Sequence, residues 1–132
     1  MSLTSPTHLK CQLEGEVLVI TLTEQELRGE DLTDTVLQEL QEAVASAPSP
    51  LKIALDLQQV KFVTSSGLAM LLRFRRYVRE QDGQLLLCGL SPLVAEVLLT
   101  TKLASSTPSM VIPFAMVPDV NAALTHFTKQ AF

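Results

Sequence analysis

The chain contains few of the residues from which metal and redox sites are built. Its 132 residues include only two cysteines, Cys11 and Cys88, and two histidines, His8 and His126. The cysteines form no CxxC pair and no cysteine–histidine cluster, which argues against a zinc site. Each cysteine lies in a strand-like apolar run, so we expect both to be reduced thiols in the core and expect no cofactor.

The sequence also lacks long apolar runs and clusters of positive charge. No stretch approaches the roughly 18 apolar residues needed to cross a bilayer, and residues 1–10 contain no apolar core of a signal peptide. We therefore expect a cytoplasmic protein without direct membrane insertion. The net charge is −4, and no Lys/Arg run exists that could follow a phosphate backbone, which argues against nucleic acid as a partner.

Catalytic signatures are missing as well. There is no GxSxG segment, and neither histidine has a carboxylate at ligand spacing in the sequence. A serine nucleophile would therefore have no evident base, and we expect that the protein is not an enzyme. Walker A and GxGxxG loops are also absent, which leaves nucleotide or phosphate binding as a weaker alternative.

The composition that is present suits one domain with a core of its own. The chain is 47% hydrophobic, and we assign residues 1–132 to a single domain with its core at about 9–130.

Strands after an initial hairpin alternate with helices, which predicts an α/β fold: a mixed sheet of about five strands covered by about four helices. The expected strands are residues 11–13, 16–23, 51–57, 84–88 and 110–114, and the expected helices are 31–47, the segment after the 62–67 junction to about 81, 92–101 and 118–129. Asp31 or Thr33 is expected to cap the first helix, and Ser91 the third.

The most informative segment joins the strand at 51–57 to the helix that ends near residue 81. A serine at a helix start accepts hydrogen bonds from free backbone amides, and the same amides favour a negative charge, so a phosphate on Ser65 would be tolerated there. Such a junction follows a strand's carboxyl end, where α/β sheets place their sites. It reads Phe62-Val63-Thr64-Ser65-Ser66-Gly67-Leu68. Helical spacing puts Leu68, Leu71, Phe74 and Val78 on one face, and Ser66, Ala69, Arg73 and Arg76 on the opposite one.

The same residues also have purely structural interpretations. Ser65 and Ser66 can simply cap the helix beside a close-packed Gly67. Asp56 can be a solvated carboxylate, or it can support the loop by accepting backbone N–H bonds. The arginines of the helix can form an ordinary solvated face, of which only Arg73 and Arg76 would extend a surface centred on Ser65.

Several blocks of the sequence, in order, resemble the STAS domain of anti-sigma factor antagonists and of sulfate-transporter tails. They are Leu55-Asp56-Leu57 with Val60, Phe62-Val63-Thr64-Ser65-Ser66-Gly67-Leu68, Leu87-Cys88-Gly89-Leu90-Ser91-Pro92, and Val117-Pro118-Asp119-Val120 with Ala123-Leu124. The resemblance covers nearly the whole chain and implies a STAS-like fold.

The resemblance further implies a partner switch. In antagonists of this family a kinase phosphorylates the first serine of an Asp-Ser-Ser-Gly segment, which corresponds to Ser65. The unmodified antagonist binds an anti-sigma factor serine kinase of GHKL ATP-binding fold and so releases sigma, phosphorylation breaks that complex, and a metal-dependent serine phosphatase restores it. For such a switch we expect the partner to contact the junction residues Thr64, Ser65, Ser66 and Gly67, together with Ala69, Arg73 and Arg76 on the helix face that the spacing above puts beside them.

The chain departs from the antagonist pattern at Thr64, where an acidic residue usually precedes the phosphorylated serine. Other members of the family are scaffolds or accessory subunits of stress-signalling or membrane transport complexes, with threonine prominent in this loop. The resemblance therefore also implies an alternative: a docking subunit without phosphorylation, or one in which Thr64 is a second acceptor.

Overall fold

The computed structural model describes residues 8–48, 50–101, 104–105 and 114–129. Within them, six strands form one mixed sheet in the order β1-β2-β4-β6-β8-β7. The strands are β1 (Leu9–Glu14), β2 (Val17–Leu22), β4 (Lys52–Asp56), β6 (Gln84–Cys88), β7 (Ala104–Ser105) and β8 (Phe114–Val117). β1 and β2 are antiparallel, whereas β2, β4, β6, β8 and β7 pair in parallel.

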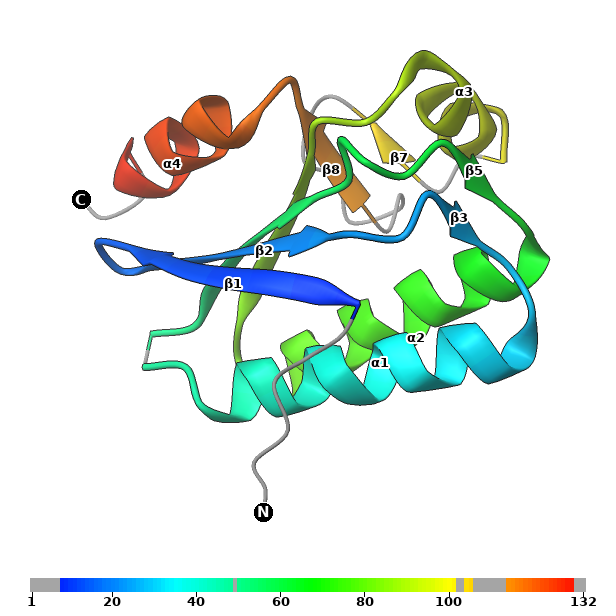
Figure 1. The fold of residues 1–132 in the computed structure, drawn as a ribbon. Helices are drawn as coiled ribbons and strands as arrows, with labels where there is room; N and C mark the ends of the chain where they lie inside the picture. The colour runs from blue at the N-terminus through cyan, green and yellow to red at the C-terminus, as the bar shows by residue number, and fades with distance from the viewer. Residues whose placement is uncertain (1–7, 49, 102–103, 106–113, 130–132) are drawn as a thin grey trace.

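Two further strands of two residues each lie outside this sheet. β3 (Glu26–Leu27) and β5 (Phe62–Val63) pair with each other in parallel, beyond the ends of β2 and β4. In Figure 1 they lie beside the start of α2 (Ser65–Glu80), at the opposite end of the molecule from the β1–β2 turn.

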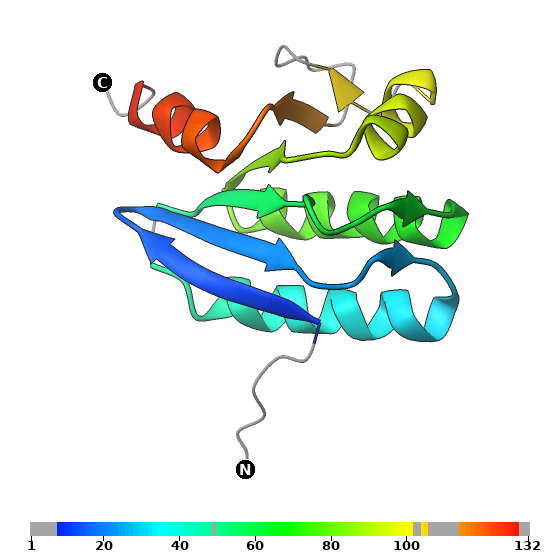
Figure 2. The same cartoon turned by 45° about the horizontal axis from the view of Figure 1, so that its top comes forward.

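The helices cover the two faces of the sheet unequally. α1 (Glu30–Ala45) and α2 pack side by side on one face, and α4 (Val120–Lys129) lies on the other (Figures 1 and 2). α3 (Pro92–Thr100) contacts β5 and β7. The predicted α/β fold, with a mixed sheet and four helices, is confirmed. The two-residue β7 adds to the five strands expected.

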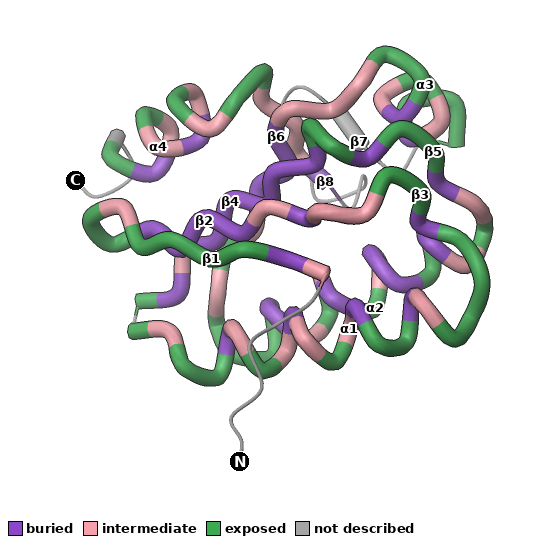
Figure 3. Tube along the Cα trace, in the orientation of Figure 1, coloured by how far each residue is buried: buried purple, intermediate pink, exposed green. Residues whose placement is uncertain are grey.

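Because α helices cover both faces, the central strands are buried on both sides. The alternate residues Ile53 and Leu55 of β4 face the larger cluster beneath α1 and α2, and Ala54 between them faces the smaller cluster under α4. Figure 3 shows this burial concentrated along β2, β4 and β6 and along the inner faces of α1 and α2. The smaller cluster consists of Val17, Val19, Ala54, Leu86, Cys88, Ala123 and Phe127.

Three local expectations need correction or restriction. α1 is preceded by Gly29, with φ 81°, and neither Asp31 nor Thr33 caps it. Instead Thr33 is buried, and its hydroxyl donates to the Gly29 carbonyl at 2.9 Å. Cys88 is buried as expected, but Cys11 is exposed because its strand forms the edge of the sheet. The strand predicted at 110–114 lies outside the described residues except for Phe114, which begins β8.

Among the described residues, no helix combines the length and apolar character needed to span a membrane. The same residues contain no group of three or more His, Cys, Asp or Glu side chains arranged to hold a metal ion.

Candidate functional site

The hydroxyl junction forms the start of α2. Thr64 has extended backbone angles of φ −96° and ψ −178° and stands just before the helix, of which Ser65 is the first residue. The Thr64 hydroxyl does not cap the helix but donates to the Leu27 carbonyl at 3.2 Å. Ser65 is exposed and Ser66 is half-buried. The junction therefore presents Ser65 to solvent while its threonine neighbour is bonded to β3.

Gly67 allows the first turn of α2 to approach β3 closely. A Cβ atom at this position would lie 2.5 Å from the Leu27 carbonyl oxygen and 2.8 Å from Val63 Cγ1. Real Cβ atoms are not found at such distances from backbone, so any larger residue would push the helix start away. Gly67, which was predicted among the contact residues, is buried and acts through packing at the junction.

The short β3–β5 ladder fixes the segment that leads into α2. The Gln25 carbonyl accepts hydrogen bonds from the Lys61 amide at 2.7 Å and from the Phe62 amide at 3.2 Å. The register then pairs Leu27 with Val63, and the Thr64 amide donates to Leu27 at 3.0 Å. The position of Ser65 is therefore set by backbone bonds to a segment 37 residues earlier, as the Thr64–Leu27 pair illustrates.

Asp56 lies below this surface, at the carboxyl end of β4. Its side chain is only 4% exposed; Oδ1 accepts from the Gln58 amide at 3.0 Å, and Oδ2 lies 3.4 Å from the donating Thr21 hydroxyl. A Cβ at Gly89, which has φ +70°, would lie 2.5 Å from Asp56 Oδ1. Asp56 thus holds the turn that leaves β4, by the backbone bonding considered for it from the sequence.

The outer face of α2 carries the remaining predicted contact residues. Ala69, Arg73 and Arg76 are exposed, as helical spacing predicts, while Leu71, Phe74 and Val78 are buried. At 1.5 Å per residue, Arg73 lies about 12 Å and Arg76 about 16 Å along the helix from Ser65. Their guanidinium groups lie near carboxylates, Arg73 at 3.8 Å from Asp34 of α1 and Arg76 at 3.9 Å from Glu80. Of these three residues Ala69 is the nearest to Ser65, about one turn along the helix.

The structure adds exposed apolar residues that sequence reasoning did not single out. Phe62 of β5 is 44% exposed, although Val63 beside it is buried. On α3, which contacts β5, Leu93 and Leu99 are 51% and 50% exposed. Neighbouring residues of a strand point to opposite faces, so the sequence predicts that Phe62 and Val63 face opposite ways. Which of the two is exposed depends on the pairing of β5 with β3, which the sequence does not show.

Two other groups considered from the sequence have structural surroundings. Burial, with the nearby carboxylates Asp56 and Asp119, raises the pKa of the Cys88 thiol to about 12, so this thiol stays protonated near neutral pH. His8 does meet carboxylates, contrary to the expectation from spacing. Its Nδ1 lies 2.6 Å from Glu24, and its backbone amide donates to Glu39 of α1 at 2.9 Å. The Glu39 contact ties the start of β1 to α1, and the Glu24 contact ties it to the segment between β2 and β3.

Comparison with known protein families identifies the family of this chain. The sequence model of the STAS domain family matches residues 11–123. The chain belongs to the STAS domain family. No curated protein sequence matches this STAS domain significantly.

Solved structures similar to this STAS domain come from two kinds of protein. An anti-sigma-factor antagonist (STAS) domain protein from Planctomyces limnophilus is 26% identical, with a TM-score of 0.71, over 89% of this chain and 95% of that one. The anti-sigma factor antagonist SpoIIAA in its unphosphorylated form is 17% identical, with a TM-score of 0.65, over 92% and 96% of the two chains. The murine anion transporter Solute Carrier 26 family member A9 is 15% identical, with a TM-score of 0.72; the match covers 89% of this domain but 18% of the transporter chain. The last two likenesses are of fold alone.

Proposed function

We propose that this STAS domain is an anti-sigma factor antagonist that regulates transcription from the cytoplasm through phosphorylation of Ser65. Its partners would be an anti-sigma factor serine kinase of GHKL ATP-binding fold, which binds the unmodified form, and a metal-dependent serine phosphatase, which removes the phosphate. The observation that carries the proposal is the exposure of Ser65 at the first residue of α2, where Thr64 is bonded to Leu27 and Gly67 is buried. Ser65 is the hydroxyl of this junction that a kinase reaches most easily.

The switch works through charge at the contact surface. A phosphate adds about −1.5 to −2 charges, and the amides and dipole of the α2 start accommodate it in the free protein. In a complex the same group must be desolvated against the partner, which costs more than the helix start returns. Phosphorylation therefore ends binding while the fold stays nearly unchanged. The similar antagonist SpoIIAA, whose structures include an unphosphorylated and a phosphorylated form, supports the proposal.

A contact surface of mixed character surrounds Ser65 in this proposal. Ala69 extends it along α2, and the exposed Phe62 and Leu93 supply apolar area on β5 and α3. Arg73 and Arg76 lie further along α2 and would meet the partner at the rim. Asp56 supports the loop from below and contacts no partner.

The test is the binding of Ser65 variants to the kinase that copurifies with the protein from its own cells. Ser65→Asp is expected to weaken binding roughly tenfold or more, while Ser65→Ala binds like the wild type. Gln38→Glu, at an exposed position on α1, adds one negative charge away from the junction and serves as the control. Equal affinities of all four proteins for the kinase would contradict the switch.

A second candidate is a constitutive docking subunit, either a STAS scaffold or an accessory subunit of a stress-signalling or transport complex. Thr64 in place of an acidic residue and the likeness to the domain of the murine anion transporter favour it. Recovery of a transporter subunit or a large scaffold, with Ser65→Asp and Ser65→Ala equal in binding, would support this function. A phosphate found by mass spectrometry on Thr64 would do so as well, whereas a phosphate on Ser65 supports the antagonist.

A further inference from the structure

β1 leaves one side of the sheet open. It is the terminal strand of the six-stranded sheet, and no other strand among the described residues pairs with its outer side (Figures 1 and 2). The Thr23 amide donates to the His8 carbonyl at 3.0 Å, so His8 and Thr23 form a hydrogen-bonded pair. In an antiparallel ladder such pairs alternate with non-hydrogen-bonded pairs, so the even-numbered residues of β1 are the ones bonded to β2. The amides and carbonyls of Leu9, Cys11 and Leu13 therefore point outward from the sheet.

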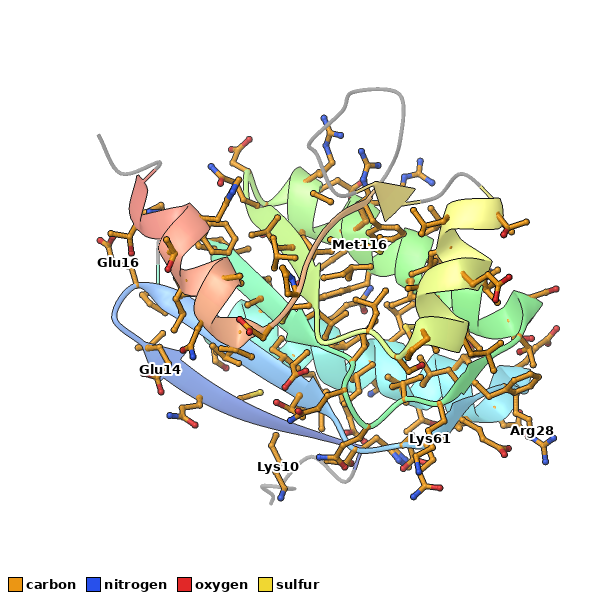
Figure 4. The ribbon with its side chains drawn as sticks, turned by 90° about the horizontal axis from the view of Figure 1, so that it is seen from above. Lys10, Glu14, Glu16, Arg28, Lys61 and Met116 are labelled. Carbon is orange, nitrogen blue, oxygen red and sulfur yellow. The ribbon has the colours of Figure 1, made fainter. Side chains whose placement is uncertain are left out.

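The side chains of β1 divide between the two faces of the sheet. Leu9, Cys11 and Leu13 point to the α1 side: Leu9 is in the core there, and the other two line a groove of about 410 Å³ against α1. Leu13 is 51% exposed, although it lies on this apolar side. Lys10, Gln12 and Glu14 point to the opposite face. Figure 4 shows Lys10 and Glu14 at the outer rim, toward the two ends of the strand.

We propose that β1 is a self-association edge, on which a second copy of this chain binds antiparallel about a two-fold axis at Gln12. Lys10 of each copy then lies opposite Glu14 of the other, Cys11 lies opposite Leu13, and Gln12 meets its own equivalent. The two sheets join into one. The grooves between β1 and α1 meet beneath the seam, and each exposed Leu13 is covered there.

The direction of the free backbone groups and the charges of Lys10 and Glu14 select this register. Because outward backbone groups belong to odd-numbered residues, Cys11 and Leu13 must form the hydrogen-bonded pairs, and Lys10 and Glu14 fall at the non-hydrogen-bonded positions, where side chains are closer. If the second copy is shifted by two residues along β1 in one direction, Cys11 lies opposite Cys11 and Lys10 lies opposite Gln12. If it is shifted by two residues in the other direction, only residues 12–14 of the two strands still pair. The proposed register is therefore the one that pairs both charges along β1.

The proposed dimer is weak and compatible with the Ser65 surface. A lysine on an edge strand usually prevents pairing with another strand. In the proposed register Lys10 lies opposite Glu14 of the second copy, which offsets its charge. A single strand edge buries less than the area of a standard stable interface, so association should depend on concentration. Ser65 starts α2 beside β5, not at β1, so the free start of α2 is left open for its own partner.

A charge exchange tests the proposal directly. The molar mass of the full chain, followed by sedimentation up to about 1 mM, should rise from monomer to dimer. Lys10→Glu alone and Glu14→Lys alone each set two pairs of like charges across the axis, and the dimer dissociation constant should rise about tenfold or more. The double variant Lys10→Glu/Glu14→Lys restores opposite charges and should recover dimerisation. Circular dichroism of each variant checks that the monomer is folded.

A cysteine scan checks the register. In a Cys11→Ser/Gln12→Cys variant the new thiols face each other at a non-hydrogen-bonded pair, and a disulfide dimer should form on mild oxidation. The wild type should form far less, because Cys11 faces Leu13. A full chain that stays monomeric throughout the concentration range would overturn the proposal. So would a double charge variant no better associated than the single ones, or a wild type that crosslinks as readily through Cys11.

Discussion

The carbonyl oxygen of Leu27 accepts two hydrogen bonds from Thr64, one from its amide at 3.0 Å and one from its hydroxyl at 3.2 Å. This pairing joins the end of β3 to the residue before α2. It also separates the roles of two adjacent hydroxyls, because that of Thr64 is engaged within the fold and Ser65 is exposed.

The phosphoacceptor should follow from this difference. With the copurifying kinase and ATP, Ser65→Ala is expected to abolish incorporation of phosphate, measured by intact mass. Thr64→Ala should keep it and should lower the free energy of unfolding by about 1 kcal/mol through the lost hydrogen bond. Phosphate retained in Ser65→Ala and lost in Thr64→Ala would reverse the assignment.

Gly67→Ala should destabilise the junction. The added methyl group would lie 2.5 Å from the Leu27 carbonyl oxygen, which is backbone and cannot rotate away. We expect a loss of about 1–3 kcal/mol in urea unfolding, despite the better helix propensity of alanine. Ser66→Ala is the matched control, since it changes the adjacent half-buried position without a new contact. A Gly67→Ala protein as stable as the control would show that α2 can move without cost.

Asp56 should matter for stability through its acceptor oxygens. Asp56→Ala leaves the Gln58 amide and the Thr21 hydroxyl without their buried acceptor and should cost about 1–3 kcal/mol. Asp56→Asn keeps one carbonyl oxygen of similar shape and should cost less. Thermal and urea unfolding of both variants measure this order, and an Asp56→Asn protein less stable than Asp56→Ala would contradict it.

The two cysteines should react very differently. Burial raises the pKa of the Cys88 thiol to about 12, with the added effect of Asp56 and Asp119, and Cys88 is fully buried. Cys11 is exposed, but it lines the groove against α1, and this partial burial also raises the pKa of its thiol. A raised thiol pKa leaves little reactive thiolate below it, so reactivity increases as the pH rises. At about pH 8 a thiol reagent should modify Cys11 in the native protein and both cysteines in urea. A Cys11→Ser protein that still reacts rapidly would show that Cys88 is accessible.

The sequence predicted the regular elements better than their surroundings. The strand expected at 84–88 is β6, and Ser91 caps α3 by accepting from the Val94 amide at 3.3 Å. Both follow from local rules, namely an apolar run and a serine–proline start. The helix expected after the 62–67 junction begins inside it, at Ser65, and neither Ser65 nor Ser66 is its cap, because Thr64 precedes the helix without a side-chain cap bond.

What the sequence missed depends on contacts between distant segments. β3 and β5 have two residues each, too few for any periodicity, and they exist because they pair with each other. The exposure of Cys11 follows from the place of β1 at the edge of the sheet, which local hydrophobicity cannot distinguish from a central position. The exposed Phe62 was missed for the same reason. These are the features that shape the candidate site and the proposed dimer edge.

The uneven covering of the sheet has a consequence for how the molecule opens. β8 joins β6 through two registered pairs, Leu87 with Met116 and Cys88 with Val117, and α4 is the helix packed over the smaller cluster. Regions with little buried apolar contact open locally at lower free energy than the whole domain. Amide hydrogens of β8 and α4 should therefore exchange with solvent before those of β4. Among the described elements, a protease should likewise cut β8 and α4 before it cuts β4.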